Sequence, residues 1–191
     1  MDLEPEQSLQ VDLGHQFNLG NLEMEVSTYV IKISDLLRWT PDASGLWRPE
    51  NTKDVLNYGL ETSLRYQKNI HQHTFHATST YTYIKTKDRT LGKELIYVPG
   101  HKVTAGLGYS LKKLSYTYQF MYTDEVFTSS DNAYKLDGYG ISNTGLFYSF
   151  GKPLKIRGGV EVRNLWNTYY ESLPSRPMPG RSYHISLRID I

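Results

Sequence analysis

The sequence predicts an all-β protein, an antiparallel meander of about nine strands that belong to a transmembrane β-barrel. Three observations lead to this prediction. Apolar and polar residues alternate along most of the chain, most regularly from Tyr183 to Ile191. The segments between them are alternately short and long. Aromatic residues are abundant although the chain is hydrophilic on average. Because successive side chains of a strand point to opposite faces, each alternating segment has one apolar and one polar face.

The composition fits a sheet that meets lipid on one face. Aromatic residues make up 13% of the chain and 16 of them are tyrosines, yet hydrophobic residues reach only 39% and the mean hydropathy is −0.51. In a membrane barrel every second residue faces lipid, and tyrosines collect at the two membrane interfaces. No apolar run approaches the roughly 18 residues that a transmembrane helix needs. The sequence therefore predicts spanning strands and no spanning helix.

Several function classes are disfavoured by the same inventory. The net charge is +1 with acidic and basic residues interspersed, which argues against nucleic-acid binding. The chain has no cysteine, so it has no disulfide, thiol nucleophile or thiolate metal site. No nucleophile elbow or zinc motif supports a hydrolase, and Gly106-Leu107-Gly108 lies inside a predicted strand and precedes no helix, unlike a nucleotide loop. We expect no enzyme and no cofactor.

Four strands are predicted in the first part of the chain, at residues 7–18, 22–39, 56–66 and 75–83. Their alternating apolar residues begin with Leu9, Val11 and Leu13, then Leu22, Met24 and Val26, then Leu56, Tyr58 and Leu60, then Phe75, Ala77, Tyr81 and Tyr83. In the second strand the apolar positions change parity at Tyr29, Ile31 and Ile33. This change predicts either a β-bulge or a strand that continues beyond the membrane.

Five strands follow, at residues 103–109, 116–122, 136–150, 154–166 and 183–191. The first two alternate clearly. Their apolar residues are Val103, Ala105, Leu107 and Tyr109 in the first, and Tyr116, Tyr118, Phe120 and Tyr122 in the second. The third is rich in glycine and of mixed parity, and the fourth alternates apolar residues with charged ones. The last strand follows Pro177, Pro179 and Gly180, which prevent a helix and favour a turn.

The connections alternate between short turns at 18–21, 67–72, 112–113 and 151–153 and long loops at 40–51, 85–99, 124–135 and 167–181. Outer-membrane barrels have this arrangement, with short periplasmic turns and longer extracellular loops. About ten residues at ~3.3 Å each span the apolar band when the strand is tilted. Nine strands is an odd number, whereas bacterial single-chain barrels have even numbers, so we expect only part of a barrel.

Several short motifs, in their order and spacing, resemble the C-terminal part of a TonB-dependent outer-membrane receptor. They are Asp2-Leu3-Glu4-Pro5-Glu6-Gln7-Ser8, Ser34-Asp35-Leu36-Leu37 with Trp39, Gly45-Leu46-Trp47-Arg48-Pro49 with Asn51, Tyr58-Gly59-Leu60-Glu61, Tyr97-Val98-Pro99-Gly100-His101-Lys102, Asn164-Leu165-Trp166-Asn167 with Tyr170, and Arg176-Pro177-Met178-Pro179-Gly180-Arg181. Together they cover essentially the entire chain. The family usually ends in an aromatic residue, whereas this chain ends in Ile191.

The resemblance implies that residues 1–191 are the last nine strands of a 22-stranded barrel and that the plug domain is not among them. It also implies TonB-coupled import of a nutrient chelate, such as an iron–siderophore complex, haem or cobalamin, across the outer membrane. The implied partners are outer-membrane lipid, the remainder of the barrel, the plug domain, TonB through the plug, and a small-molecule metal chelate. The transported substrate is not specified by these motifs.

Binding residues are expected on the long loops, because loops on a rigid scaffold commonly carry function. Candidate ligand contacts are Trp47, Arg48, Tyr97, Phe127, Tyr134, Arg176 and Arg181, of which the last two arginines suit an anionic chelate. The alternative for these residues is an interface belt or turn packing. His71, His73 and His76 are the densest group of possible metal ligands, but they fall in a predicted turn and we expect no tight metal site there.

Two alternatives remain open at this point. Without its first strand the chain has eight, an even number, which fits a small complete barrel such as an adhesin or envelope enzyme, closed between residues 22–39 and 183–191. A soluble β-rich binding module is the other alternative, and the absence of a signal peptide at Met1 superficially favours it. If the chain is instead part of a larger barrel, its first and last strands are both unpaired sheet edges.

Overall fold

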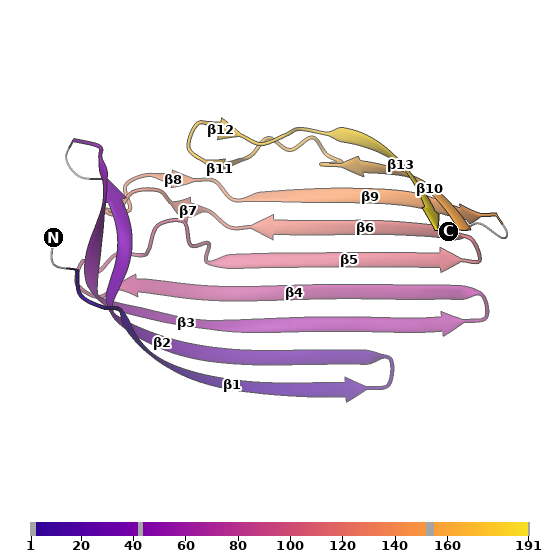
Figure 1. The fold of residues 1–191 in the computed structure, drawn as a ribbon. Helices are drawn as coiled ribbons and strands as arrows, with labels where there is room; N and C mark the ends of the chain where they lie inside the picture. Colours follow the sequence, from indigo (N-terminus) through magenta and orange to yellow (C-terminus); the bar gives the residue numbers. More distant parts are fainter. Residues whose placement is uncertain (1–2, 42–43, 152–154, 191) are drawn as a thin grey trace.

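The structure is a computed structural model that describes residues 3–41, 44–151 and 155–190 (Figure 1). Nine strands form the main sheet: β1 (Gln7–Leu19), β2 (Leu22–Pro41), β3 (Trp47–Ile70), β4 (His73–Asp88), β5 (His101–Leu111), β6 (Leu114–Thr123), β9 (Tyr139–Phe150), β10 (Lys155–Arg163) and β13 (Ser182–Asp190). Two small hairpins lie between them, β7 (Val126–Phe127) with β8 (Lys135–Leu136), and β11 (Glu171–Leu173) with β12 (Arg176–Pro177). The described residues include no helix long and apolar enough to cross a membrane.

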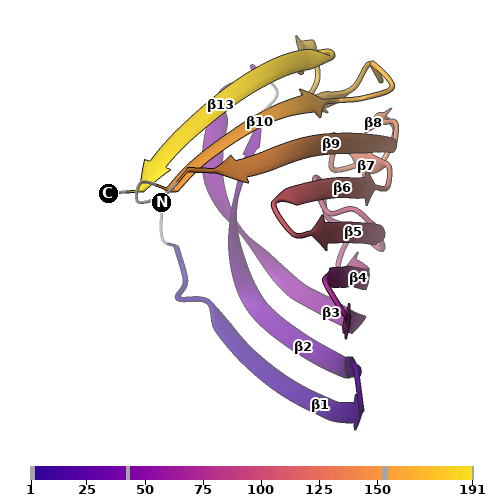
Figure 2. The ribbon, with the colours of Figure 1, turned by 90° about the vertical axis from the view of Figure 1, so that its right-hand side faces the viewer.

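The nine strands form one antiparallel meander in the order β1-β2-β3-β4-β5-β6-β9-β10-β13. The sheet curves into an open wall (Figure 2), and β1 and β13 are its two edges within the described residues. The predictions of a meander and of two unpaired edges are confirmed. The small complete barrel is wrong for these residues, because β2 pairs with β1 and β3 and not with β13.

The strand register separates an apolar face from a polar one, since cross-strand partners share a face. The apolar face carries Leu9, Leu64, Tyr118, Leu187 and Ile189, as the alternation predicted, and the polar face carries Gln10, Arg65, Gln119, Arg188, Glu61, Glu161, Arg157 and Arg163. Ile185 on the apolar face is 88% exposed, which suits contact with lipid. The shallow hollows of the sheet are lined by the polar parity, so this face is the concave one.

Two groups of aromatic residues mark the ends of the apolar face. Near the short turns, the rings of Phe75 and Tyr109 lie 5.1 Å apart, and near the long loops Tyr83 lies 5.1 Å from His101. At ~3.3 Å per residue, β4 rises about 26 Å between Phe75 and Tyr83. This length matches the roughly 25 Å apolar band of an outer-membrane barrel, flanked by its aromatic girdles.

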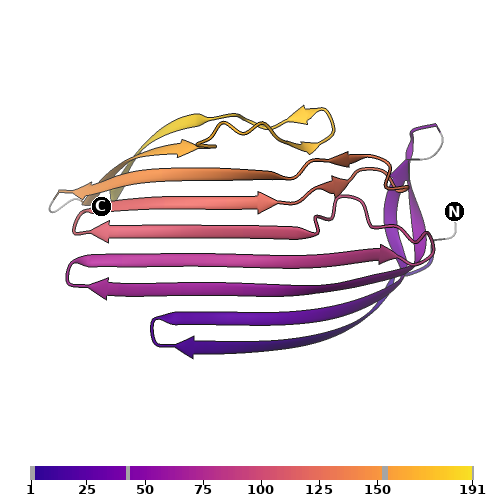
Figure 3. The same ribbon diagram turned by 180° about the vertical axis from the view of Figure 1, so that it is seen from behind.

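The short and long connections segregate to opposite ends of the sheet, as Figures 1 and 3 show. The expected turn at 67–72 is shorter than predicted, because β3 runs to Ile70 and only His71 and Gln72 connect it to β4. His71 takes a φ of 53°, which such a tight hairpin requires. The loop expected at 85–99 begins later, since β4 extends to Asp88. The expected turn at 151–153 lies mostly outside the described residues.

The expected loop at 40–51 was wrong. Strand β2 runs to Pro41 and β3 begins at Trp47, so the two strands continue as a long hairpin beyond the rest of the sheet. The described pairs of these two strands keep one register, so no bulge explains the change of parity, and the strands do continue beyond the rest of the sheet. Tyr29 lies on the concave face over Gly59, where an added Cβ would come within 2.6 Å of the Tyr29 hydroxyl. Local packing on the concave face therefore accounts for this apolar residue.

The outer part of this hairpin bends away from the direction of the other strands (Figures 1 and 2). Asp35 has a φ of 56°, and the Asn51 side-chain amide donates a hydrogen bond to the Asp35 carbonyl at 2.6 Å. Arg38 forms an ion pair at 3.7 Å with Asp88, whose side chain is almost fully buried. Asp88 also accepts hydrogen bonds from the backbone N–H groups of Thr90 and Leu91. Asp88 therefore contacts both the bent part of the hairpin and the loop that follows β4.

Candidate ligand-binding cavity at the loop end

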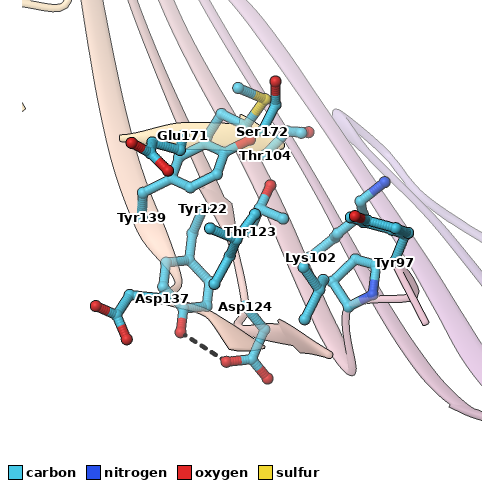
Figure 4. Close-up of a pocket in the computed structure, with 14 residues that line it drawn as sticks. Tyr97, Lys102, Thr104, Tyr122, Thr123, Asp124, Asp137, Tyr139, Glu171 and Ser172 are labelled. Carbon is cyan, nitrogen blue, oxygen red and sulfur yellow. Dashed lines mark hydrogen bonds between the residues drawn. The ribbon is translucent and has the colours of Figure 1, made fainter. Parts of the chain in front are cut away.

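A cavity of about 400 Å³ lies where β5, β6 and β9 reach the long-loop end of the sheet (Figure 4). The hairpins β7–β8 and β11–β12 contribute to its wall, and β11 contacts β8. The lining residues are Tyr97, Pro99, Lys102, Thr104, Met121, Tyr122, Thr123, Asp124, Val126, Leu136, Asp137, Tyr139, Glu171 and Ser172. The site therefore combines strand residues from a rigid scaffold with residues from three long loops.

Residues 89–100 and 124–138 are tied to each other beside the cavity. The Tyr97 backbone N–H donates to the Phe127 carbonyl at 2.9 Å. The Asn132 side chain receives a hydrogen bond from the Glu94 N–H and donates one to the Glu94 carbonyl. Tyr97 has a φ of 59°, a left-handed conformation uncommon for an aromatic residue. These bonds place the Tyr97 side chain in the cavity wall.

Asn164 organises the loop that brings Glu171 and Ser172 over the cavity. It is only 4% exposed, and its side chain exchanges two hydrogen bonds with the backbone of Thr168, each at 2.8 Å. Its own N–H donates to the Asn143 side chain at 3.0 Å. Asn commonly adopts the left-handed conformation that Asn164 has here, with a φ of 49°. The motif at residues 164–167 therefore has a structural role.

The polar groups of the cavity carry an excess of negative charge. Three carboxylates, Asp124, Asp137 and Glu171, line it with one ammonium group, Lys102. Figure 4 shows Asp124 and Asp137 on one side, with Glu171 beside the Tyr139 ring. The Tyr122 hydroxyl donates to Asp124 at 3.1 Å. These carboxylates make the cavity suited to a cation or to a hydrogen-bond donor.

Neutral donors hold the Glu171 carboxylate in place. The Tyr169 hydroxyl donates to one of its oxygens at 2.6 Å, and the Ser175 N–H donates to the other at 3.0 Å. The hydrogen bond to Glu171 raises the pKa of Tyr169. Burial, followed by the neighbouring Tyr139, raises the pKa of Tyr170, whose ring lies 4.5 Å from the Tyr139 ring. The charge of Glu171 is thus oriented without being neutralised by these contacts.

Among the predicted ligand contacts, only Tyr97 lines the cavity. Phe127 lies in β7 and contributes its carbonyl to the contact with Tyr97. Tyr134 is 71% exposed in the same loop region. The remaining candidates lie on other elements: Trp47 and Arg48 begin β3, Arg176 begins β12, and Arg181 precedes β13 with its N–H bound to the Asn167 side chain. The structure brings Tyr97 and Phe127 together, and every candidate except Tyr97 lies outside the cavity wall.

Sequence reasoning missed the carboxylates and Lys102. Lys102 and Tyr139 lie on the polar face of β5 and β9, close to the long loops. This position in the sequence could have marked them as candidate site residues. Asp137 lies in a loop and Glu171 begins the three-residue strand β11, and neither segment is long enough for periodicity to mark the direction of a side chain. Their convergence depends on how the hairpins β7–β8 and β11–β12 fold back.

The histidines at the short turns occupy different environments. His73 lies on the apolar face, and its Nδ1 is hydrogen-bonded to the Tyr109 hydroxyl at 2.7 Å. His76 has the polar parity, and His71 lies in the turn. No group of three or more potential metal-ligating residues converges within the described part of the chain. The expected lack of a tight site stays a prediction for metal titration.

Comparison with known proteins gives consistent results. A family model described as TonB dependent receptor-like, beta-barrel, matches residues 1–165. The vitamin B12 transporter BtuB of Vibrio vulnificus (strain YJ016) is 21% identical over 185 residues, which cover 96% of this chain and 28% of that protein. Among solved structures, the copper transporter OprC superposes with a TM-score of 0.79 at 19% identity, covering 95% of this chain and 31% of that one.

Two siderophore receptors of Acinetobacter baumannii have the same fold. BauA, the ferric preacinetobactin receptor, has a TM-score of 0.77 at 18% identity, and the alignment covers 96% of this chain and 29% of BauA. PirA has a TM-score of 0.73 at 20% identity, with 97% and 32% covered. This chain therefore spans less than a third of the length of these relatives. At such identities the solved structures establish the shared architecture.

Proposed function

Because this chain belongs to the TonB-dependent receptor-like β-barrel family, whose members are outer-membrane β-barrel proteins, we propose that residues 1–191 form the C-terminal part of a barrel that imports a nutrient chelate with energy supplied through TonB. In this proposal the apolar face meets outer-membrane lipid. The remaining strands and a plug domain complete the transporter, and the plug contacts TonB. The family consists of receptors and transporters, so we propose binding and transport rather than a chemical reaction.

The observation that carries this proposal is the cavity at the long-loop end of the concave, polar face. Long loops of outer-membrane barrels are extracellular, so a substrate arriving from the medium meets this end first. The cavity combines apolar walls with oriented carboxylates and an ammonium group, as small-molecule sites commonly do. We propose that Tyr97 and the other lining residues contact the substrate. Trp47, Arg48, Phe127, Tyr134, Arg176 and Arg181 are then further contacts on the surrounding loops.

The relatives support a metal-containing nutrient as the substrate class. Their names assign vitamin B12 to BtuB, copper to OprC and ferric preacinetobactin to BauA. These three substrates differ in size and charge, but each contains a metal. We therefore propose a metal complex for this receptor and take its chemical character from the cavity itself.

Uptake measurements test the proposal. Cells expressing the receptor that carries this chain are supplied with radiolabelled iron chelates, haem, cobalamin or copper, in strains with and without TonB. We expect uptake of one class that requires both the receptor and TonB. The control is a receptor variant that binds TonB poorly. Receptor-dependent uptake that is equal without TonB, or no uptake of any metal complex, would contradict the proposal.

A further inference from the structure

We propose that the cavity at the loop end selects a positively charged complex and disfavours anionic chelates. This inference rests on the proposed transport function and concerns the charge of its substrate. Its basis is the imbalance in the lining, where Asp124, Asp137 and Glu171 oppose a single cation, Lys102. A ligand with positive charge restores neutrality on entry, whereas an anionic ligand adds to the repulsion.

Two of the three carboxylates are oriented by neutral groups, so their charge remains available to a ligand. Asp124 accepts hydrogen bonds from the Tyr122 hydroxyl and the Glu125 N–H, and Glu171 accepts from the Tyr169 hydroxyl and the Ser175 N–H. Such donors fix a carboxylate without cancelling its charge. Two oriented carboxylates, Asp124 and Glu171, and a third, Asp137, line one cavity and therefore act together on whatever enters.

Lys135, which precedes the lining residue Leu136, is already paired with a carboxylate outside the lining. Lys135 forms an ion pair at 2.7 Å with Glu125, and this hydrogen bond raises the pKa of Lys135. Glu125 and Lys135 are both about half exposed and together contribute no net charge. Among the arginines of the polar face, Arg65 and Arg157 lie close to the short turns, and Arg163 ends β10 near the long loops but outside the cavity lining. The negative charge is thus a local property of the cavity.

The apolar part of the lining limits the ligand further. Met121, Val126 and Leu136 lie among the lining residues with the aromatic rings of Tyr97 and Tyr139. Tyrosine faces attract cations through their quadrupole, so the rings reinforce the preference set by the carboxylates. The expected ligand is a complex of low polarity with exposed cationic or N–H donor groups. About 400 Å³ accommodates part of such a complex.

Introduced cysteines measure this preference directly, because the chain has no cysteine of its own. Ser172→Cys places a thiol in the cavity wall, and Tyr134→Cys places one on the exposed loop outside it. Each is made in the complete receptor, with any other cysteines replaced. The rates of modification by a cationic and an anionic methanethiosulfonate reagent are compared at low ionic strength. We expect the cation-to-anion rate ratio at residue 172 to exceed that at residue 134 by about tenfold, and to fall in high salt.

Neutralising variants assign the effect to the cavity. In the Ser172→Cys background, Asp124→Asn with Asp137→Asn should reduce the ratio, and Lys102→Met should increase it. The matched control is Glu25→Gln, which removes a carboxylate from the polar face of β2 but not from the lining. A ratio at residue 172 equal to that at residue 134, or one that favours the anionic reagent, would overturn the proposal.

Protection of the thiol tests binding with two inert probes of opposite charge and the same octahedral shape. The hexaamminecobalt(III) cation should slow modification of Ser172→Cys by an uncharged thiol reagent, whereas hexacyanocobaltate(III) should not. Equal or better protection by hexacyanocobaltate(III), lost in Arg176→Gln or Arg181→Gln, would instead assign the site to anions. These results do not depend on uptake, so failure of the cation preference is distinguishable from failure of TonB-dependent transport.

Discussion

Individual residues on the concave face set how closely the strands and side chains approach one another. Gly59 lies directly beneath Tyr29, and a Cβ at this position would be 2.5 Å from the Tyr83 carbonyl oxygen. Tyrosine packing over a glycine compensates for the missing side chain in a strand. Asn164 has a comparable local role in the loop above β10, where its buried side chain replaces backbone partners.

Gly59→Ala should destabilise the barrel, because either Tyr29 or the backbone of β4 must move. We expect a cost of about 1–3 kcal/mol in the free energy of unfolding, the range typical of overpacking. The matched control is Gly158→Ala, where the nearest atom would be 3.8 Å away. Urea-induced unfolding of the receptor in lipid vesicles measures both. Equal stability of the two variants would show that Tyr29 does not constrain residue 59.

Asp131 makes the order of its loop depend on pH. Its carboxylate accepts hydrogen bonds from the Ser129 hydroxyl at 2.6 Å and the Ala133 N–H at 3.0 Å, which lower its pKa. The contribution of Asp131 is therefore fully present above the ordinary pKa of about 4 and is lost as pH falls through the lower folded-state pKa. Hydrogen exchange at residues 129–134 should accelerate, relative to its intrinsic rate, across that interval. The Asp131→Asn variant should lack this transition, and an unchanged pH profile in it would refute the assignment.

At the level of strands, alternation predicted much more than turn composition did. All nine main strands were predicted, and the faces of most of them followed from the parity of residues such as Leu64 and Arg65, except in the strand at residues 136–150, whose parity is mixed. The hairpin of β2 and β3 was missed because Pro41 and Pro49 suggested a loop. Beyond the sheet these two strands form a ribbon with an open edge on each side, and proline is tolerated on such edges. The prolines predicted a loop, whereas pairing between β2 and β3 keeps these residues in strands.

The two faces of β13 should respond differently to charge. Leu187→Arg places a cation on the apolar face and should cost roughly 2–4 kcal/mol near the bilayer midplane. Ser186→Arg points to the polar face and should cost much less. Unfolding of both variants in lipid vesicles compares them in the same strand. Equal penalties would mean that the apolar face does not contact lipid.

The candidate site illustrates why loops are harder to predict than strands. Tyr97 was identified from its place in a long loop, and it does line the cavity. Glu171 was not, because it reaches the cavity only when β11 folds back toward β8 and Asn164 holds the loop behind it. That arrangement depends on hydrogen bonds between segments distant in sequence, which no short-range pattern reports.

Considered as one body, the described residues form a curved sheet that does not close on itself. Its edges, β1 and β13, present unpaired backbone groups beside an apolar face. Such edges recruit other chains in water, and lipid offers them no hydrogen bonds. In a complete barrel these two strands therefore need partners other than each other.

A polypeptide of these 191 residues, expressed by itself, should be insoluble or oligomeric without detergent. The reason is the open edges together with exposed residues such as Leu13 and Ile185 on the apolar face. Size-exclusion chromatography with light scattering measures the state. A monodisperse, soluble monomer would contradict this expectation and would require another way of covering the apolar face.

The bent hairpin of β2 and β3 has a mechanical consequence. From Ser34 to Pro41 it reaches about 23 Å beyond its base at ~3.3 Å per residue. Asp35, which has a left-handed backbone conformation, lies at the bend, and the ion pair between Arg38 and Asp88 ties the bent part to the neighbouring loop. A rotation of about ten degrees at the bend would move Pro41 by about 4 Å over such a length. The same rotation would move Arg38, about 10 Å from Asp35, by about 2 Å and separate it from Asp88, so this ion pair fixes the position of Trp39 and Trp47 relative to the sheet.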